Sequence, residues 1–204
     1  MSNRNRINSE WVDTALDSIE RAFLSAEGMA YLGEDVTMVQ HQLQAAALAG
    51  GSSDEFVVAA LLHDVGHMLG RDDGGMDATA AMAEDRDAHH DASGARWLSR
   101  WFGREVTEPV RLHVAAKRFL VSTEPDYAAK LSEASVHTLR LQGGPMSPAE
   151  IAEFEGLDFA SQAVALRRLD EAAKDASTDA PGLEAHREIL LRVLHREAMR
   201  RSVA

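Results

Sequence analysis

The chain has 204 residues, of which 45% are hydrophobic, so it is long enough to bury a sizeable core as one domain. Its formal net charge of -12 excludes a broad surface for nucleic acid or for an anionic membrane, because nothing offsets phosphate repulsion. No cysteine is present, which excludes disulfides, thiolate nucleophiles and zinc–thiolate sites and leaves His, Asp and Glu as metal ligands. Without a signal-like N-terminus or a long apolar span, we expect a soluble cytoplasmic protein.

Helical periodicity governs the first part of the chain. Residues 1–8 are polar, and we expect them to be frayed. The apolar spacing over residues 9–28 predicts a helix that a glycine closes, and the loop Tyr31-Leu32-Gly33-Glu34 follows. Thr37 and Ser53 should cap the next two helices, because a hydroxyl before an apolar run accepts hydrogen bonds from free N–H groups.

The middle of the chain alternates a loop with further helices. Residues 71–87 are rich in Gly, Asp and Ala and predict a loop or lid. His89-His90 should open a helix that ends at Gly103. Two Thr-Glu-Pro triplets, at 107–109 and 123–125, predict the starts of two more helices, since proline is favoured in the first helical turn.

Two clear breaks divide the last part, at Gly143-Gly144-Pro145 and at Ala180-Pro181-Gly182. Between them, Ser147-Pro148-Ala149-Glu150 combines a capping box with a proline at the first helical position. After them, residues 183–200 form the last helix. Because no strand-like alternation of useful length occurs, we predict an all-α single domain that spans the chain, with about eight to ten helices.

One stretch of the third helix carries chemistry. The apolar run 57–62 ends in His63-Asp64, and His67 follows one helical turn later. Adjacent helical residues point about 100° apart, so His63 and Asp64 can share an ion only near a helix end or distortion. We expect Gly66 to provide that loosening. A carboxylate and an imidazole beside so much aliphatic surface would be costly without a cation, so we interpret this pair as the centre of a metal site.

The remaining ligand types occur in the order H…HD…H…H…D, and this order resembles the HD-domain superfamily of metal-dependent helical proteins. The resemblance covers about residues 28–172 and implies that domain's helical bundle. His90 is preferred to His89 because His90-Asp91-Ala92-Ser93-Gly94-Ala95 resembles the family segment H-x-x-x-G-A. The six metal ligands that the resemblance implies are His41, His63, Asp64, His90, His113 and Asp170.

Six ligands exceed what one ion with open positions requires. A two-metal site in which Asp64 bridges the ions uses all of them, and it holds the ions about 3.5–4 Å apart. The natural division places His41, His63 and Asp170 on one ion and His90 and His113 on the other.

Most members of the superfamily hydrolyse phosphate esters, and a smaller group are mixed-valent diiron oxygenases. The loop from Tyr31 to Glu34 resembles the Tyr-x-Gly-Glu loop of the organophosphonate-cleaving oxygenases of the PhnZ and TmpB kind. The resemblance implies that Tyr31 occupies an iron position until substrate displaces it, and that Glu34 holds the loop. It also implies substrate contacts from four side chains, His67, Lys117, Ser135 and Arg167.

Helical spacing agrees with this assignment. His113 and Lys117 are i, i+4 neighbours and share one helix face, and Arg167 lies three residues before Asp170. Charge-assisted donors would thus stand beside the metals and form the local basic pocket that the acidic chain otherwise lacks.

The leading hypothesis, which the resemblance carries, is an oxygenase with two iron ions, Fe(II)/Fe(III), and O2 as co-substrate. It cleaves the C–P bond of 1-hydroxy-2-(trimethylammonio)ethylphosphonate or of its 2-amino analogue, and it gives phosphate with glycine betaine or glycine. The overall resemblance leans slightly to the trimethylammonio substrate. The partner is then a small anionic phosphonate, supplied by an upstream hydroxylase.

Two alternatives remain open. One is an HD-domain phosphohydrolase for a nucleotide or phosphomonoester, in which a metal-bound hydroxide attacks phosphorus and Tyr31 and Glu34 hold no metal. The other is a regulatory or structural module with a vestigial site.

Overall fold

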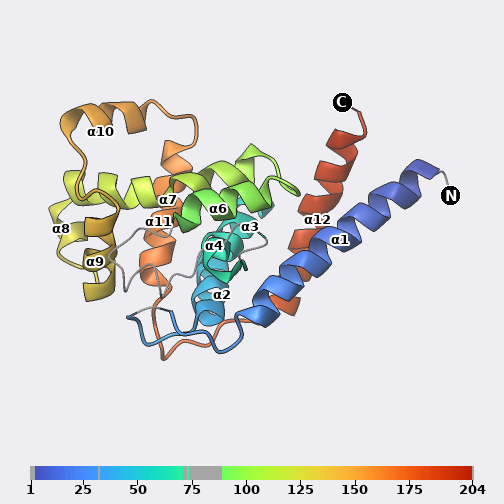
Figure 1. The fold of residues 1–204 in the computed structure, drawn as a ribbon, viewed down its shortest axis with the longest axis horizontal. Coiled ribbons are helices and arrows are strands. Elements are labelled where there is room, and N and C mark those ends of the chain that lie inside the picture. Colours follow the sequence, from blue (N-terminus) through green and yellow to red (C-terminus); the bar gives the residue numbers. More distant parts are fainter. Residues whose placement is uncertain (1–2, 32, 71–72, 74–88, 204) are drawn as a thin grey trace.

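The computed structural model describes residues 3–31, 33–70, 73 and 89–203 (Figure 1). Within these ranges the regular structure is helical, apart from one isolated antiparallel bridge between Ala30 and Thr37, so the all-α prediction is confirmed. The described helices are α1 (Asn3–Ser25), α2 (Met38–Leu48), α3 (Asp54–Leu62), α4 (Val65–Met68), α6 (His90–Leu98), α7 (Arg104–Thr123), α8 (Pro125–Ala128), α9 (Glu133–Leu141), α10 (Pro148–Glu155), α11 (Ala160–Ala172) and α12 (Leu183–Arg201).

Helix α3 lies at the centre of the protein. Its residues Val57 to Leu62 are all buried, with side chains on every face of the helix, because α2, α7, α11 and α12 surround it. Burying each large aliphatic side chain here contributes about 1.5–3 kcal/mol. Ser53 caps α3 as predicted, and its hydroxyl accepts a hydrogen bond from the Phe56 N–H at 3.3 Å. The interior of the fold therefore fixes the position of the α3 C-terminus.

The terminal helices α1 and α12 pack along each other on one side of the bundle (Figure 1). Helix α1 begins at Asn3, so the expected fraying is wrong for Asn3 to Asn8. The reason is this pairing, in which the Ser202 hydroxyl at the end of α12 donates to the Asn8 side chain at 3.1 Å.

Helices α7 and α11 pack closely on the other side. Helix α7 begins at Arg104, so the predicted start at Thr107 is wrong. Pro109 lies inside the helix, which continues past it although proline has no N–H to donate to the carbonyl four residues earlier. A second apolar cluster between α7, α10 and α11 anchors this part, and it contains Leu112, Ala116, Phe154, Ala160 and Ala163.

Several predicted helix ends are confirmed. Thr37 and Ser147 each form a complete capping box, and Pro125 begins α8. Gly143 and Gly144 both adopt positive φ at the predicted break. The helix after His89 ends at Leu98, earlier than predicted.

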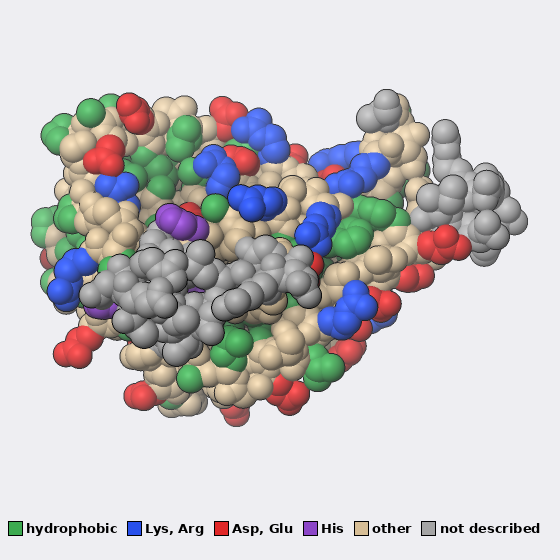
Figure 2. All heavy atoms as spheres, in the orientation of Figure 1, with side chains coloured by type: hydrophobic (Ala, Val, Ile, Leu, Met, Phe, Trp, Pro, Cys, Tyr) green, Lys and Arg blue, Asp and Glu red, His purple; other side chains and the backbone are tan. Residues whose placement is uncertain are grey.

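The predicted loop or lid at residues 71–87 lies outside the described residues, except for Asp73, whose carboxylate lies 3.1 Å from Arg100. None of the helices in the described ranges is long and apolar enough to cross a membrane. Basic and acidic side chains both occur across the face shown in Figure 2, interspersed with apolar and neutral ones.

Candidate metal centre

The His63-Asp64 pair lies where α3 ends and α4 begins. His63 still has helical backbone angles, whereas Asp64, at φ -101° and ψ 15°, has left the helix. Adjacent residues inside a helix point about 100° apart, so this helix end is what allows His63 and Asp64 to face one site.

Gly66 does not cause that break, contrary to our expectation, because it lies inside α4. A Cβ at Gly66 would lie 2.0 Å from the backbone oxygen of His90. Glycine is thus required for α4 to approach α6, and this close approach brings His90 to the site.

The structure brings the six predicted ligands together in two buried groups. Within each group the candidate ligand atoms lie within 4.8 Å of one another. The first group is His41, His63 and Asp170, and the second is Asp64, His90 and His113.

Asp64 faces both groups with a different oxygen. Its Oδ2 lies 3.6 Å from Nε2 of both His41 and His63. Its Oδ1 lies 3.3 Å from Nε2 of His90 and 3.4 Å from Nε2 of His113. This is the arrangement that a carboxylate bridging two cations requires.

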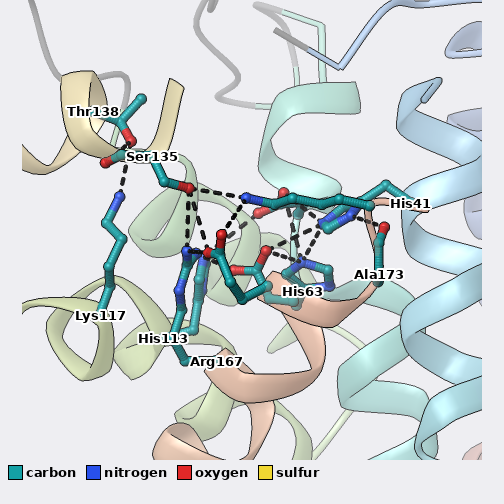
Figure 3. A network of polar contacts seen from close by, with 12 residues as sticks. His41, His63, His113, Lys117, Ser135, Thr138, Arg167 and Ala173 are labelled. Carbon is teal, nitrogen blue, oxygen red and sulfur yellow. Dashed lines mark hydrogen bonds and ion pairs between the residues drawn. The ribbon is translucent and has the colours of Figure 1, made fainter. Parts of the chain in front are cut away.

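The first group fits a cation and little else. His41 Nδ1 lies 2.8 Å from the Ala173 carbonyl (Figure 3). His63 Nδ1 lies 2.9 Å from the Ala60 carbonyl. A carbonyl can only accept, so each Nδ1 carries a proton and Nε2 is the atom left to face the site. Burial opposes a charge on His63, but Asp64 and Asp170 outweigh it and raise its pKa to about 9, so without a metal a proton occupies its Nε2. These two Nε2 atoms lie 3.0 Å apart. Two Nε2 atoms this close need a cation between them, either the proton on His63 or a metal ion, and nitrogen ligands about 2.1 Å from a metal have this spacing.

The second group repeats much of this pattern. His113 Nδ1 lies 2.6 Å from the Val110 carbonyl, and its Nε2 lies 3.1 Å from Nε2 of His90. The Oδ1 atoms of Asp64 and Asp170 are buried and complete no hydrogen bond among the described residues. Buried carboxylate oxygens are rarely left this way, so they too fit metal ligation.

The electrostatics keep both aspartates ionised. Burial would raise the pKa of Asp64, but His63 and the other imidazoles hold it well below its usual range. Burial likewise opposes ionisation of Asp170, and Arg167 outweighs it, so this pKa is also well below its usual range. Burial and the neighbouring His67 lower the pKa of His90 to about 3, so its ring is neutral and able to bind a metal.

Tyr31 covers the first group. Its ring stacks on the His41 ring, with centroids 4.1 Å apart and planes inclined by 14°. Burial, and then the Asp64 charge, raise the pKa of the Tyr31 hydroxyl well above its usual value. Gly33 has φ +78°, and a Cβ there would lie 2.7 Å from the Cβ of Ala134, so this glycine lets the loop pack on α9.

Glu34 points away from the ligands. Its Oε1 accepts a hydrogen bond from the Ser132 hydroxyl at 2.6 Å and lies 3.1 Å from Nζ of Lys174. These contacts tie the Tyr31 loop to α9 and to the end of α11.

The predicted basic side chains lie beside the first group. Lys117 is 3% exposed and donates to the Thr138 hydroxyl at 2.9 Å (Figure 3). Burial, and then the charge of Arg167, lower the pKa of Lys117 to about 7. Arg167 Nη2 lies 3.4 Å from the Ser135 hydroxyl, so α7, α9 and α11 each place one predicted residue here.

His67 and His90 stack with ring centroids 4.0 Å apart and planes inclined by 20°. Nδ1 of His67 is buried and has no hydrogen-bond partner among the described residues. His89 is exposed with φ 48°, whereas His90 is in the second group, as predicted from the segment that follows it.

Sequence reasoning missed four residues around Arg167. Its guanidinium donates to the carboxylates of Asp170 and Glu171 and, at 2.8 Å, to the Tyr127 hydroxyl. Of these, Glu171 and Tyr127 were missed. The other two missed residues are Thr138, which accepts the hydrogen bond from Lys117, and Lys174, which contacts Glu171 and Ser135. Helical spacing would have indicated one of them, because Glu171 lies four residues after Arg167 on α11.

These features define a helical protein with buried His and Asp groups able to bind metal. A family model described as HD domain matches residues 25–152, and the chain belongs to the HD-domain family. The match ends before Arg167 and Asp170, which α11 contributes.

Among named relatives, the chain is 47% identical over 153 residues to [1-hydroxy-2-(trimethylamino)ethyl]phosphonate dioxygenase (glycine-betaine-forming) of Leisingera caerulea, which covers 74% of this chain and 76% of that protein. It is 46% identical over 165 residues to hydroxymethylphosphonate dioxygenase of Gimesia maris, which covers 79% and 80%. It is also 30% identical over 190 residues, 92% and 85%, to an uncharacterised protein of Acanthamoeba polyphaga mimivirus.

Proposed function

We propose that this protein is an O2-dependent oxygenase that cleaves the C–P bond of a small 1-hydroxyphosphonate at a centre of two iron ions. Two relatives of similar identity, both named as phosphonate dioxygenases, support the reaction class. The two ligand groups that share Asp64 support a two-metal centre. Imidazole and carboxylate ligands without thiolate suit iron.

The observation that carries the proposal is the position of Tyr31 on the first ligand group. The phenol lies against His41, and burial, followed by the charge of Asp64, raises its pKa. Such a phenol ionises only against a cation, so a metal held by this group would convert Tyr31 into a ligand. In the phosphohydrolase alternative, Tyr31 would hold no metal.

Two basic side chains and a serine hydroxyl would bind the phosphonate group. Lys117, Arg167 and Ser135 stand next to the first group and present charge-assisted donors to a phosphonate oxygen. An anion bound there places its C1 hydroxyl toward the metal position that Tyr31 covers. Substrate would then displace Tyr31, and His67 beside the second group is a further donor to the substrate.

The overall reaction balances without another reductant. A 1-hydroxyalkylphosphonate and O2 together contain the atoms of one carboxylic acid and one phosphate, so the C–P bond breaks and C–O and P–O bonds form. Two irons held by the six His and Asp side chains would supply the redox chemistry with O2, while the protein binds and orients the substrate and neutralises its charge. The trimethylammonio and amino substrates, with products glycine betaine and glycine, remain our proposed pair. Supply by an upstream hydroxylase and a cytoplasmic location remain predictions from the sequence.

The test is phosphate release from purified iron-loaded protein with each hydroxyphosphonate, with and without O2. We expect release that requires O2, with an equal yield of the carboxylate. The assay is run in parallel with a phosphomonoester, and oxygen-independent release from that ester would replace the oxygenase by a hydrolase.

A further inference from the structure

Lys174 is a buried cation that neither the ligand groups nor the predicted phosphonate contacts include. The chain contains three lysines: Lys117, Lys130 and Lys174. Lys130 is exposed, whereas the side chain of Lys174 is only 10% exposed. Lys174 directly follows Ala173, whose carbonyl holds Nδ1 of the ligand His41, so its backbone is fixed next to the metal centre.

The ammonium group of Lys174 joins three parts of the site. Its Nζ lies 3.1 Å from Glu34 Oε1 in the Tyr31 loop and 2.9 Å from the Ser135 hydroxyl on α9. It also lies 3.3 Å from Glu171 Oε1 on α11. An ammonium has three N–H donors, so these three partners use all of them.

The contact with Glu34 holds the Tyr31 loop. The Glu34 N–H donates to the Tyr31 carbonyl at 2.9 Å, and the Tyr31 N–H donates to the Val36 carbonyl at 3.1 Å. Because the loop is this short, fixing the Glu34 carboxylate also fixes the Tyr31 ring on His41.

The contact with Ser135 places the same ammonium where an anion would bind. Arg167 directs Nη2 at this hydroxyl too, but its guanidinium is already paired with Asp170 and Glu171. Lys174 is likewise paired with two carboxylates, but one of them is Glu34, so of these two cations it is Lys174 that also contacts the Tyr31 loop. A phosphonate dianion at Ser135 offers it two negative charges, against the single charge of Glu34.

We propose that Lys174 is a positioning residue that holds the Tyr31 loop closed through Glu34 and releases it when a phosphonate binds at Ser135. Binding of the anion and departure of Tyr31 from the metal centre are then coupled through one side chain. This inference rests on the proposed function for the identity of the anion.

The experiment measures amide hydrogen exchange of Tyr31 and Glu34 in the metal-loaded protein. The probe is methylphosphonate, which carries the phosphonate but lacks the C1 hydroxyl needed for turnover. In the wild type, saturating methylphosphonate should raise exchange at both amides by about tenfold, because the loop opens locally. In Lys174→Gln, exchange should already be raised by about tenfold without the probe and should not respond to it.

Two matched variants complete the test. Lys174→Arg keeps the charge and should retain the response, and Lys130→Gln, at the exposed lysine, should behave as the wild type. If methylphosphonate leaves the wild-type amides unchanged, or if Lys174→Gln still responds to it, the proposal is wrong.

Failure of the proposed function gives a different result. If no hydroxyphosphonate releases phosphate but the amides still respond to methylphosphonate, the coupling stands and the reaction is wrong. If phosphate is released with O2 and the amides do not respond, the reaction stands and the role of Lys174 is wrong.

Discussion

His41 and His63 direct their Nε2 atoms at each other across 3.0 Å, while each uses Nδ1 to hold a backbone carbonyl. A turn of either ring would break its hydrogen bond to that carbonyl. The folded protein therefore presents two ring nitrogens in the geometry that a bound cation needs, and metal binding and stability should be linked.

Removal of the metal should lower the thermal stability of the protein. Dialysis against a strong chelator removes the cation that these ligands would share and leaves the buried carboxylates of Asp64 and Asp170 to the imidazoles and Arg167 alone. A metal at about 1,000 times its dissociation constant contributes about 4 kcal/mol, so we expect a loss of about 10 °C in Tm. Calorimetry with and without chelator measures this, and ferrous iron added back should restore Tm. An unchanged Tm after verified removal of metal would contradict the linkage.

The two tyrosines should differ in their effect on the metal centre. Tyr31 stacks on His41, whereas Tyr127 accepts a hydrogen bond from Arg167. A phenolate on ferric iron absorbs visible light, so Tyr31→Phe should lose the visible band of substrate-free protein while keeping its iron content. Tyr127→Phe is the matched control and should keep the band. Visible absorption together with iron analysis distinguishes the two, and an unchanged band in Tyr31→Phe would exclude Tyr31 as a ligand.

Much of the fold could be predicted because it depends on local signals. Thr37, Ser53 and Ser147 cap helices where the sequence predicts caps, since a hydroxyl before an apolar run acts through its own neighbours. The start of α7 could not be predicted, because Pro109 reads as a first-turn residue although it lies inside the helix. Tertiary packing, and not propensity, decides whether a helix continues through a proline.

The candidate site could be predicted in its residue types but not in its connections. The order of His and Asp residues names the six that the structure brings together, because ligands recur beside helical patterns. Gly66 and Lys174 show the limit. Gly66 allows the close contact of α4 with His90. Lys174 contacts Glu34, which is 140 residues earlier in the sequence, and Ser135, which is 39 residues earlier. Such long-range contacts leave no periodic signal.

Asp54 should give a small, pH-dependent contribution to stability. It lies in the first turn of α3, and Arg192 on α12 donates to its carboxylate at 3.0 and 2.8 Å. The hydrogen bond from Arg192 lowers the pKa of Asp54 from 3.8 to about 2. Because the folded pKa is the lower one, the contribution is complete above about pH 4 and is lost as the pH falls through about 2.

The measurement is urea unfolding of wild type and Asp54→Asn. These side chains are largely solvated, so we expect a loss below about 1 kcal/mol at neutral pH that shrinks toward about pH 3 and in high salt. Asp158→Asn removes an exposed pair with Arg104 and should be neutral. A difference for Asp54→Asn that stays constant down to about pH 3 would assign the loss to helix contacts instead of ionisation.

Lys117 should make the affinity for the phosphonate depend on pH. Burial and the charge of Arg167 lower its pKa to about 7, so the ammonium form predominates only below that pH in the free protein. An anion binds the charged form, and binding should tighten as the pH falls through about 7. Lys117→Gln keeps a hydrogen bond to Thr138 within reach but has no charge to lose. Its apparent KM should exceed that of the wild type by about tenfold at low pH, with the ratio falling toward one at higher pH.

Taking the ratio of the two KM values cancels the ionisation of the phosphonate itself, because both proteins meet the same substrate. Iron content should match that of the wild type, since Lys117 pairs with Thr138 and not with a ligand. Lys130→Gln is the control for loss of a lysine charge at an exposed position and should give a ratio near one at every pH. A KM ratio for Lys117→Gln that is independent of pH would mean that Lys117 acts through packing and not through its charge.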